Sequence, residues 1–436
     1  MEKTNLLNLK APGGWINDPN GFIYYKGTYH LFYQHFPYVP IWGTMHWGHA
    51  TSKDLINWQH EDIALYPTKS FDKNGVFSGS AIEIDGGLGL YYTGIVYPGQ
   101  RDDNIHMSTE GYSVQTQGLV LSPDGESFDN FDSKWQVVPE FNNEEIAADY
   151  DCRDPKVFRL GEEYVMTLAT TYKRQEGVLL LLKSQDGRKW DFFSRLQDKR
   201  LGYCLECPDI FKLEENYYLI CSPMGNMKNS GTYENQAIIT PVSFDEKTGQ
   251  VSLGDEDRQK FFDYGMDVYA PQSNLDEKGR RTVIAWVRMP EAKRPYSNTA
   301  AGKKDWNGMM TLPRIVEERD GEIYTRPHDN VRTYFEENAT VLEETDKKTI
   351  RKADSYTQIK MLLKEGESLN LQGYVIELQR GYVIADRSQV MGNAKGVQLI
   401  SRSPYIGDEV ELEVYKEKDI IEIYINDGQY VITHAL

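Results

Sequence analysis

The chain has 436 residues, of which 66 are acidic and 48 are basic, so its formal net charge is −18. This length predicts two domains. The negative charge repels phosphate backbones and anionic lipid, so we expect no nucleic-acid partner and no membrane partner. Residues 1–10 are too polar for a signal peptide, and four cysteines are too few for a disulfide framework. We therefore expect a cytoplasmic protein with reduced thiols.

Strand starts of one kind recur along the first two thirds of the chain. In three of them an acidic residue stands just before a proline, followed by a Phe, a hairpin turn and a Tyr-rich strand: Asp18, Asp154 and Glu206. Two further segments, beginning at Phe77 and Tyr269, have the same strand–turn–strand pattern with a different opening. Together they indicate five repeats of one supersecondary unit.

A second pattern follows the strand starts. A serine is followed by Asp two positions later and by an aromatic residue six positions later, at 52–58, 122–128 and 184–190. A repeat of roughly 60–70 residues with about four short strands is typical of one propeller blade. The five repeats thus predict an N-terminal five-bladed β-propeller, and an array of β-sandwich sheets without radial symmetry is the alternative.

The pattern changes after Arg314, where charged residues become denser. Alternating apolar and polar residues then return at 374–378, 397–400, 410–414 and 420–425, and an Asn-Asp-Gly turn follows the last of these. Such alternation predicts a small antiparallel β-sandwich. We expect an all-β protein with a propeller over residues 1–330 and a β-sandwich over residues 331–436.

The three acidic residues at the strand starts are the candidate catalytic groups. Inner strands of a propeller face one axial funnel, so Asp18, Asp154 and Glu206 are expected to converge there. Clustered like charges raise the pKa of at least one carboxyl group, which argues against a purely structural role. Glycoside hydrolysis requires one ionised and one protonated carboxyl group. The alternative is that each acid caps its own turn and faces solvent.

Several motifs resemble the signature segments of glycoside hydrolase family 32, which contains invertases, fructanases and sucrose-6-phosphate hydrolases. They are Trp15-Ile-Asn-Asp-Pro-Asn-Gly21, Phe77-Ser-Gly-Ser80, Arg153-Asp-Pro155, Glu206-Cys-Pro-Asp209, Asp267-Val-Tyr-Ala-Pro-Gln272 and Trp306-Asn-Gly-Met-Met-Thr-Leu-Pro-Arg314. The resemblance runs from Pro12 to about Arg314 and continues more loosely in the tail. The family fold is a five-bladed propeller followed by a β-sandwich.

The resemblance implies a role for each carboxylate. Asp18 matches the nucleophile that forms a fructosyl-enzyme, Glu206 matches the general acid/base, and Asp154 matches the residue that stabilises the transition state. Arg153 is expected to keep Asp154 ionised. A retaining mechanism predicts that the carboxyl groups of Asp18 and Glu206 lie about 5–5.5 Å apart. The residues expected to contact the terminal fructose are Asn17, Gln34, Trp42, Phe77, Ser78, Arg153 and Asp267.

The resemblance predicts a β-fructofuranosidase that acts on a small sugar: sucrose, sucrose 6-phosphate or a short fructo-oligosaccharide. A transfructosylase, an inactive fructan-binding propeller and an inverting enzyme acting on arabinans are the alternatives. We expect neither a metal nor an organic cofactor, although four histidines lie between His30 and His49 and two cysteines have C-x-x-C spacing. The C-terminal sandwich is expected to stabilise the propeller or to mediate assembly into a homo-oligomer.

Overall fold

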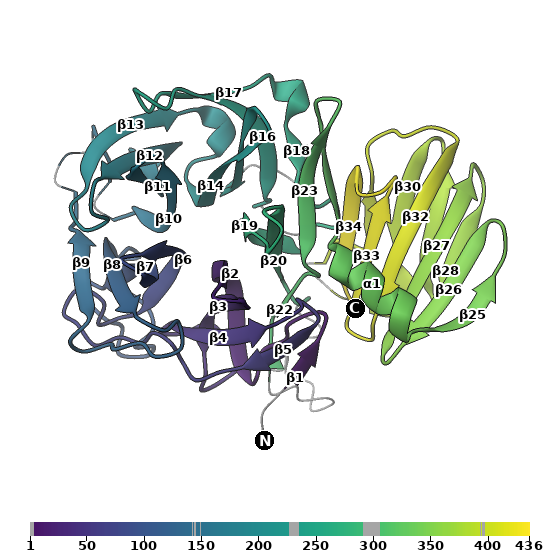
Figure 1. The fold of residues 1–436 in the computed structure, drawn as a ribbon, viewed down its shortest axis with the longest axis horizontal. Coiled ribbons are helices and arrows are strands. Elements are labelled where there is room, and N and C mark those ends of the chain that lie inside the picture. The colour runs from purple at the N-terminus through teal and green to yellow at the C-terminus, as the bar shows by residue number, and fades with distance from the viewer. Residues whose placement is uncertain are drawn as a thin grey trace.

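The computed structural model describes residues 4–141, 143, 145–148, 150–225, 235–290, 306–392, 394 and 397–436. The protein is all-β, with a propeller followed by a β-sandwich (Figure 1). None of the helices in the described residues is long and apolar enough to cross a membrane.

In the described residues, the propeller part consists of five sheets in which almost all strand pairs are antiparallel. The first contains β1 (Thr4–Leu6), β2 (Gly14–Tyr25), β3 (Thr28–Phe36), β4 (His46–Ser52) and β5 (Asn57–His60), and the second contains β6 (Val76–Ile84), β7 (Gly87–Val96), β8 (Val114–Ser122) and β9 (Lys134–Val138). The third contains β10 (Arg153–Leu160), β11 (Glu163–Tyr172), β12 (Glu176–Ser184) and β13 (Asp191–Gln197).

The fourth sheet contains β14 (Leu205–Leu213), β15 (Asn216–Pro223), β16 (Ile238–Phe244), β17 (Val251–Leu253) and β18 (Lys260–Phe261). The fifth contains β19 (Val268–Leu275), β20 (Arg281–Val287), β22 (Met309–Met310), β23 (Arg314–Arg319) and β24 (Glu322–Pro327). Two short 3₁₀ helices, η1 (Lys199–Leu201) and η2 (Glu256–Arg258), lie in connections.

The five sheets form a ring that closes on itself. Each sheet packs its first long strand against that of the next, in the order β2, β6, β10, β14 and β19, and β19 packs against β2 again. The segment around residue 308 joins the two ends of the ring: β21 (Trp306–Asn307) pairs with β2, and β22 pairs with β20. The inner strands therefore face one central space, as Figure 1 shows.

The serine–aspartate pattern forms the turn between the third and fourth strands of a sheet. Ser122 Oγ accepts a hydrogen bond from the backbone N–H of Gly125, and Asp124 Oδ1 accepts one from the N–H of Ser127. Ser52 with Asp54 and Ser184 with Asp186 make the equivalent contacts. Side chains that satisfy the backbone in this way favour a turn over a continued strand, which explains why the pattern recurs.

In the described residues, the C-terminal part has two sheets and the short helix α2 (Ser388–Met391). The larger sheet contains β25 (Thr340–Glu344), β26 (Lys348–Ala353), β27 (Tyr356–Lys364), β32 (Glu409–Lys416), β33 (Ile420–Ile425) and β34 (Tyr430–Ala435), and the smaller contains β28 (Ser368–Leu371), β29 (Tyr374–Gln379), β30 (Tyr382–Asp386) and β31 (Ile400–Arg402). The strand expected at 397–400 begins only at Ile400. The short helix α2 (Ser388–Met391) precedes β31.

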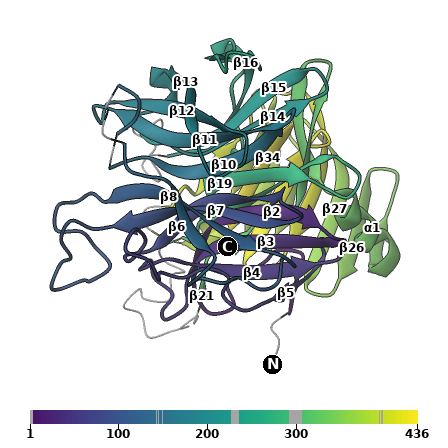
Figure 2. The same ribbon diagram turned by 60° about the vertical axis from the view of Figure 1, so that its left-hand side comes forward.

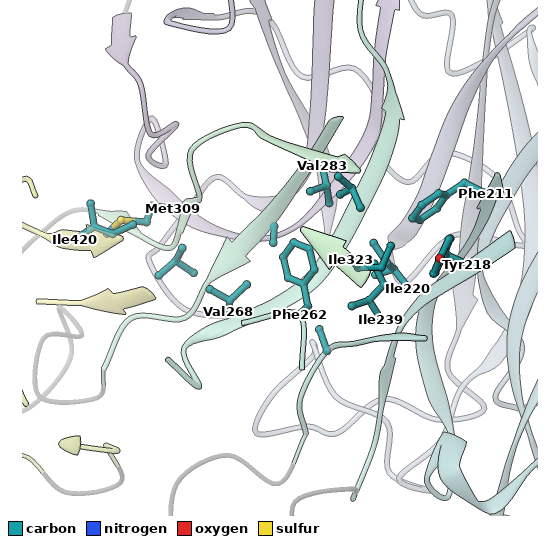
Figure 3. Close-up of a cluster of buried hydrophobic side chains, with 14 of the residues drawn as sticks. Phe211, Tyr218, Ile220, Ile239, Phe262, Val268, Val283, Met309, Ile323 and Ile420 are labelled. Carbon is teal, nitrogen blue, oxygen red and sulfur yellow. The ribbon is translucent and has the colours of Figure 1, made fainter. Parts of the chain in front are cut away.

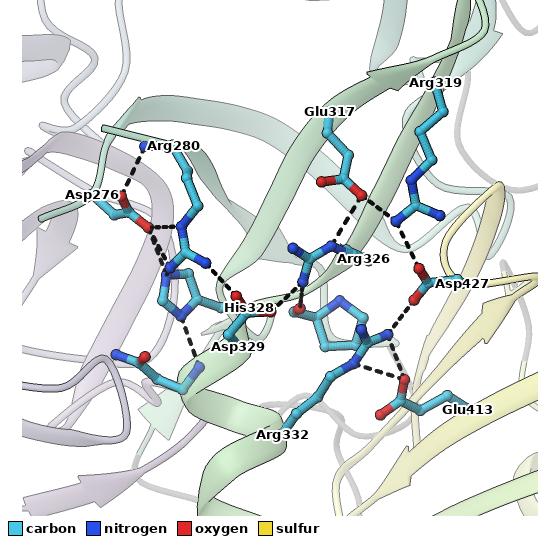
Figure 4. A network of polar contacts seen from close by, with 12 residues as sticks. Asp276, Arg280, Glu317, Arg319, Arg326, His328, Asp329, Arg332, Glu413 and Asp427 are labelled. Carbon is cyan, nitrogen blue, oxygen red and sulfur yellow. Dashed lines mark hydrogen bonds and ion pairs between the residues drawn. The ribbon is translucent and has the colours of Figure 1, made fainter. Parts of the chain in front are cut away.

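Helix α1 (Asp329–Asn338) links the two parts and was not among the expected elements. His328 caps its N-terminus by accepting a hydrogen bond from the N–H of Asn330, and Val331 and Phe335 bury one face four residues apart. Figure 4 shows the charged network around it, in which Arg332 binds Asp427 and Glu413 of the sandwich. The linker between the domains is therefore an ordered, paired segment.

The sandwich packs against the fifth sheet (Figures 1 and 2). A buried apolar cluster crosses the boundary: Phe262 and Val268 from the ring lie with Ile420 and Ala435 from the sandwich, as Figure 3 shows for the labelled members. Arg314, which is fully buried, pairs with Asp263 and Glu422. The interface thus resembles a domain core that contains compensated charges.

Candidate active site

A pocket of about 450 Å³ opens at the centre of the ring. It contains the carboxylates of Asp18, Asp154 and Glu206, which come from β2, β10 and β14. The structure therefore brings together the three acids that the sequence placed on separate repeats. Asp18 and Asp154 are largely buried, and the carboxylate of Glu206 is partly exposed.

Irregular pairing positions these side chains. The register of β10 is interrupted between Arg153 and Lys156, and that of β14 is interrupted between Glu206 and Asp209. Asp154 and Cys207 follow the last residue paired before each interruption, and both have positive φ, 61° and 50° respectively. Such strained backbone is characteristic of functional sites.

The place of the acids before the prolines had suggested equivalent positions in the repeats. The structure shows that the three acids do not occupy equivalent positions. Glu206 takes the place of Arg153, and Cys207 takes the place of Asp154. The backbone N–H of Cys207 donates a hydrogen bond of 2.9 Å to Asp154 Oδ2. Its Sγ lies 3.7 Å from both Asp154 Oδ2 and Asp18 Oδ2. An uncharged thiol therefore separates two carboxylates, where a third acid in the same position would add repulsion.

Asp18 is held by hydrogen-bond donors. Ser78 Oγ donates to Asp18 Oδ2 over 2.6 Å, and Asn17 Nδ2 donates to Oδ1 over 3.2 Å. Burial raises the pKa of Asp18 to about 6, and the charge of Glu206 adds to the rise, while the hydrogen bond from Ser78 opposes it. Asp18 is thus ionised at neutral pH and is oriented as a nucleophile must be.

Burial likewise raises the pKa of Asp154, to about 7, and the charges of Glu206 and Asp18 contribute to the rise. Arg153 lowers this pKa but does not outweigh burial. Arg153 thus acts in the expected direction, towards the ionised form of Asp154, while burial acts against it. Its Nε is 4.0 Å from Asp154 Oδ2, whereas its terminal nitrogens lie 3.1 Å from Glu206 and 3.2 Å from Asp151.

Glu206 is fixed from two sides. Arg153 Nη2 donates to Oε1 over 3.1 Å, and the hydroxyl group of Tyr269 donates to Oε2 over 2.6 Å. Burial raises the pKa of Tyr269 well above its usual range, so its hydroxyl group keeps its proton. The Glu206 carboxyl group is thus pre-oriented at the pocket wall, as a general acid/base must be.

Most of the expected substrate-contacting residues line this pocket: Asn17, Gln34, Trp42, Phe77, Ser78 and Arg153. Asp267 does not. It is 1% exposed and pairs with Arg387 of the sandwich, so its side chain points away from the position where a sugar would bind. The motif around Asp267 could not reveal this contact, because its buried partner Arg387 lies 120 residues further along the chain.

The pocket also contains residues that the sequence did not single out as substrate contacts. Trp15 and Tyr269 stood within recognised motifs, so their spacing could have identified them. The others lie largely on connecting loops, whose placement depends on tertiary contacts. The additional lining residues include Trp15, Tyr97, Met107, Tyr112, Gln115, Asp151, Tyr269 and Trp286.

Comparison with known proteins agrees with this geometry. The model of the Glycosyl hydrolases family 32 N-terminal domain matches residues 9–327. The chain belongs to glycoside hydrolase family 32. This family 32 protein is 32% identical to a sucrose-6-phosphate hydrolase from Escherichia coli, over 99% of this chain and 88% of the relative, and 30% identical to a raffinose invertase from the same organism, over 99% and 89%.

Solved structures show the same fold for this family 32 chain. The β-fructofuranosidase BmSUC1 from Bombyx mori matches with a TM-score of 0.77 and 27% identity, over 99% of this chain and 89% of that one. The sucrose-6-phosphate hydrolase from Lactobacillus gasseri matches with a TM-score of 0.81 and 23% identity, over 99% and 88%. The likeness therefore extends through both parts of the protein.

Proposed function

We propose that this protein is a retaining β-fructofuranosidase that releases terminal fructosyl units from sucrose-type substrates. The observation that carries the proposal is the arrangement of Asp18 and Glu206. They stand in one pocket, one ionised and held by Ser78, the other held by Tyr269 and Arg153. Two carboxyl groups with different surroundings are the requirement for glycosyl transfer through a covalent intermediate.

The proposed reaction uses these three side chains in turn. The Asp18 carboxylate attacks the anomeric carbon of the fructosyl unit, and Glu206 donates its proton to the glycosidic oxygen as that bond breaks. Asp154, buried beside Asp18 and bound by the N–H of Cys207, stabilises the positive charge that develops on the sugar ring. Glu206 then removes a proton from water, which displaces Asp18 and releases fructose.

The walls of the pocket suit one sugar ring. Gln34 donates to Ser78 through Nε2, while its buried Oε1 has no hydrogen-bond partner among the described residues and can accept a hydrogen bond from a sugar hydroxyl group. Trp42 and Phe77 meet edge to face, 5.8 Å apart between ring centroids, and offer an apolar surface. A pocket of about 450 Å³ accommodates a terminal unit together with part of its leaving group.

The position of Glu206 supports an assignment of the leaving group. Asp151 and Tyr112 line the pocket with Glu206, and Arg153 links Asp151 to Glu206. We assign the leaving sugar to this side, because the proton donor must reach the glycosidic oxygen. The relatives named sucrose-6-phosphate hydrolase, and a structure of a BmSUC1 mutant in complex with sucrose, support a sucrose-type substrate.

The test is fructose release from sucrose, sucrose 6-phosphate, 1-kestose and inulin, run beside the Glu206→Gln variant. We expect turnover of at least one substrate and a loss of about 10²–10⁴-fold in the variant. Product anomers followed by NMR should retain the β configuration. Fructose binding without turnover would instead support an inactive binding module, and an inverted first product would contradict the assignment of Asp18 as nucleophile.

The cysteines bear on location. Cys152, Cys204, Cys207 and Cys221 are free thiols, and three of them are buried. Proteins with unpaired cysteines are typical of reducing compartments, and this supports a cytoplasmic location. Fractionation of the source cells with an antibody against the protein tests it, and recovery outside the cytoplasmic fraction would contradict it.

A further inference from the structure

The C-terminal sandwich holds Asp267, which directly precedes β19, the strand that carries Tyr269. Arg387, which follows β30, lies against the Asp267 carboxylate with its two terminal nitrogens 2.5 Å and 3.1 Å from the two oxygens. Arg387 is fully buried and Asp267 is 1% exposed. The backbone N–H of Ala435 donates to the same carboxylate over 2.9 Å. A bidentate pair in a buried site fixes orientation as well as distance.

Arg387 is itself rigidly placed. Its Nε donates to the carbonyl oxygen of Gln398 over 2.9 Å, and Nη1 donates to that of Ala435 over 2.7 Å. These partners all belong to the sandwich. The position of Asp267 is thus set from the C-terminal domain, although Asp267 belongs to the segment that enters the propeller.

Tyr269 follows Asp267 by two residues and lies in β19, which begins at Val268. Val268 between them is buried in the apolar cluster that includes Met309 and Ile420 (Figure 3). The backbone carbonyl of Asp267 also accepts a hydrogen bond of 2.8 Å from the N–H of Arg288, whose guanidinium group lies 4.8 Å from the Tyr269 ring centroid. The start of β19 is therefore fixed by Arg387, which binds the Asp267 side chain, and by Arg288, which binds the Asp267 backbone.

The Tyr269 hydroxyl group has two acceptors within reach. It lies 2.6 Å from Glu206 Oε2 and 3.3 Å from the carbonyl oxygen of Ser222. A displacement of β19 would change the lengths of both contacts. Because catalytic efficiency falls steeply when a reacting group is misplaced, the contact with Glu206 is sensitive to how the strand is held.

We propose that Arg387 and Asp267 are positioning residues that hold Tyr269 against the acid/base Glu206, so that the C-terminal sandwich takes part in catalysis. The inference rests on the proposed role of Glu206. It gives the sandwich a function beyond stabilising the ring. It also gives Asp267 a role in place of the sugar contact that the sequence suggested.

The experiment compares two substrates of the full-length protein. Sucrose has a poor leaving group that needs the proton of Glu206, whereas 4-nitrophenyl β-fructofuranoside has a leaving group that departs without one. We expect Arg387→Lys and Asp267→Asn to lower kcat/KM for sucrose about tenfold or more, and to lower it much less for the aryl substrate. Tyr269→Phe should change the ratio of the two values in the same direction.

A double variant tests whether these residues act through one another. If Arg387 acts through Tyr269, Arg387→Lys combined with Tyr269→Phe should change the substrate ratio no more than Tyr269→Phe alone. Multiplied effects would overturn the proposal. Should Arg387→Lys fail to fold, Asp267→Asn combined with Tyr269→Phe provides the same comparison.

Lys10→Met is the matched control. Lys10 pairs with Glu417 and Asp419 across the same domain boundary and lies outside the pocket. We expect this variant to lower Tm and to leave the ratio of the two kcat/KM values unchanged. A wild-type protein that hydrolyses neither substrate would contradict the proposed function. An active wild type whose ratio is unchanged in both Arg387→Lys and Asp267→Asn would contradict the positioning role alone.

Discussion

Arg153 binds Glu206, the proposed acid/base, with Nη2 3.1 Å from Oε1. It does so although its chain neighbour is Asp154, whose Oδ2 lies 4.0 Å from Arg153 Nε. One buried cation thus contacts Glu206 directly and Asp154 at longer range. We therefore expect Arg153 to influence how activity depends on pH.

Replacing Arg153 by Gln should move the acid limb of the kcat/KM profile for sucrose to higher pH. Arg153 lowers the pKa of Asp154 against the larger effect of burial. Without the cation this pKa rises further above about 7, so Asp154 becomes protonated at higher pH. We expect the acid limb of kcat/KM for sucrose to move upward by about one pH unit, together with a lower maximum. Arg153→Lys, which keeps a charge, should move it less, and an unmoved limb in Arg153→Gln would refute this account.

Replacing Asp154 by Asn should stabilise the fold at alkaline pH. An unfolded Asp titrates near about 3.9, whereas burial raises the pKa of folded Asp154 to about 7. The folded state therefore binds the proton more tightly, and the free energy of unfolding falls as pH rises through this interval. Asn has no such dependence. We expect the variant to be inactive but more stable than wild type by about 4 kcal/mol at pH 8.

The same comparison at lower pH supplies the control. Below about pH 4 both states of the wild type are protonated, so the two proteins should unfold with similar free energies. Denaturant titrations at pH 8, 6 and 4 measure the trend. A stability difference that is constant with pH would show that lost packing, and not the buried charge, is responsible.

We expect catalytic activity to survive a neutral replacement of Cys207 but not a charged one. Its Sγ lies 3.7 Å from carboxylate oxygens of both Asp18 and Asp154, and burial raises the pKa of its thiol well above the usual range. We expect Cys207→Ser to keep most of the activity and Cys207→Asp to lose about 10²-fold or more in kcat. Iodoacetamide should leave Cys207 unmodified in the native protein, because the thiolate is the reactive form.

Chelation should leave activity unchanged. The proposed reaction uses the carboxylates of Asp18, Asp154 and Glu206 and draws on no metal chemistry. Within the described residues, one group of metal-ligating side chains gathers at Asp276, Glu277 and His328. Asp276 there already binds His328 and Arg280 (Figure 4). Fructose release measured before and after dialysis against EDTA checks this, and activity restored by an added divalent cation would contradict it.

The sequence alone identified features that repeat along the chain. The strand starts and the serine–aspartate turns are local patterns, because each side chain bonds to backbone a few residues away. The same holds for Asp18 and Glu206, which stand in motifs whose order and spacing resemble one family. The helix α1 was missed because its short apolar face is covered by tertiary contacts, through Val331 and Phe335.

Only the tertiary structure decided which charged groups meet. Arg153 binds Glu206, 53 residues away, more closely than it approaches its neighbour Asp154. Asp267 binds Arg387, 120 residues away, and thereby leaves the sugar pocket. Electrostatic and hydrogen-bond partners are set by distance in space, which the order of residues does not contain. The sequence therefore predicted the fold and the acids that meet in the pocket, and the packing of the chain in space determined how those acids are held.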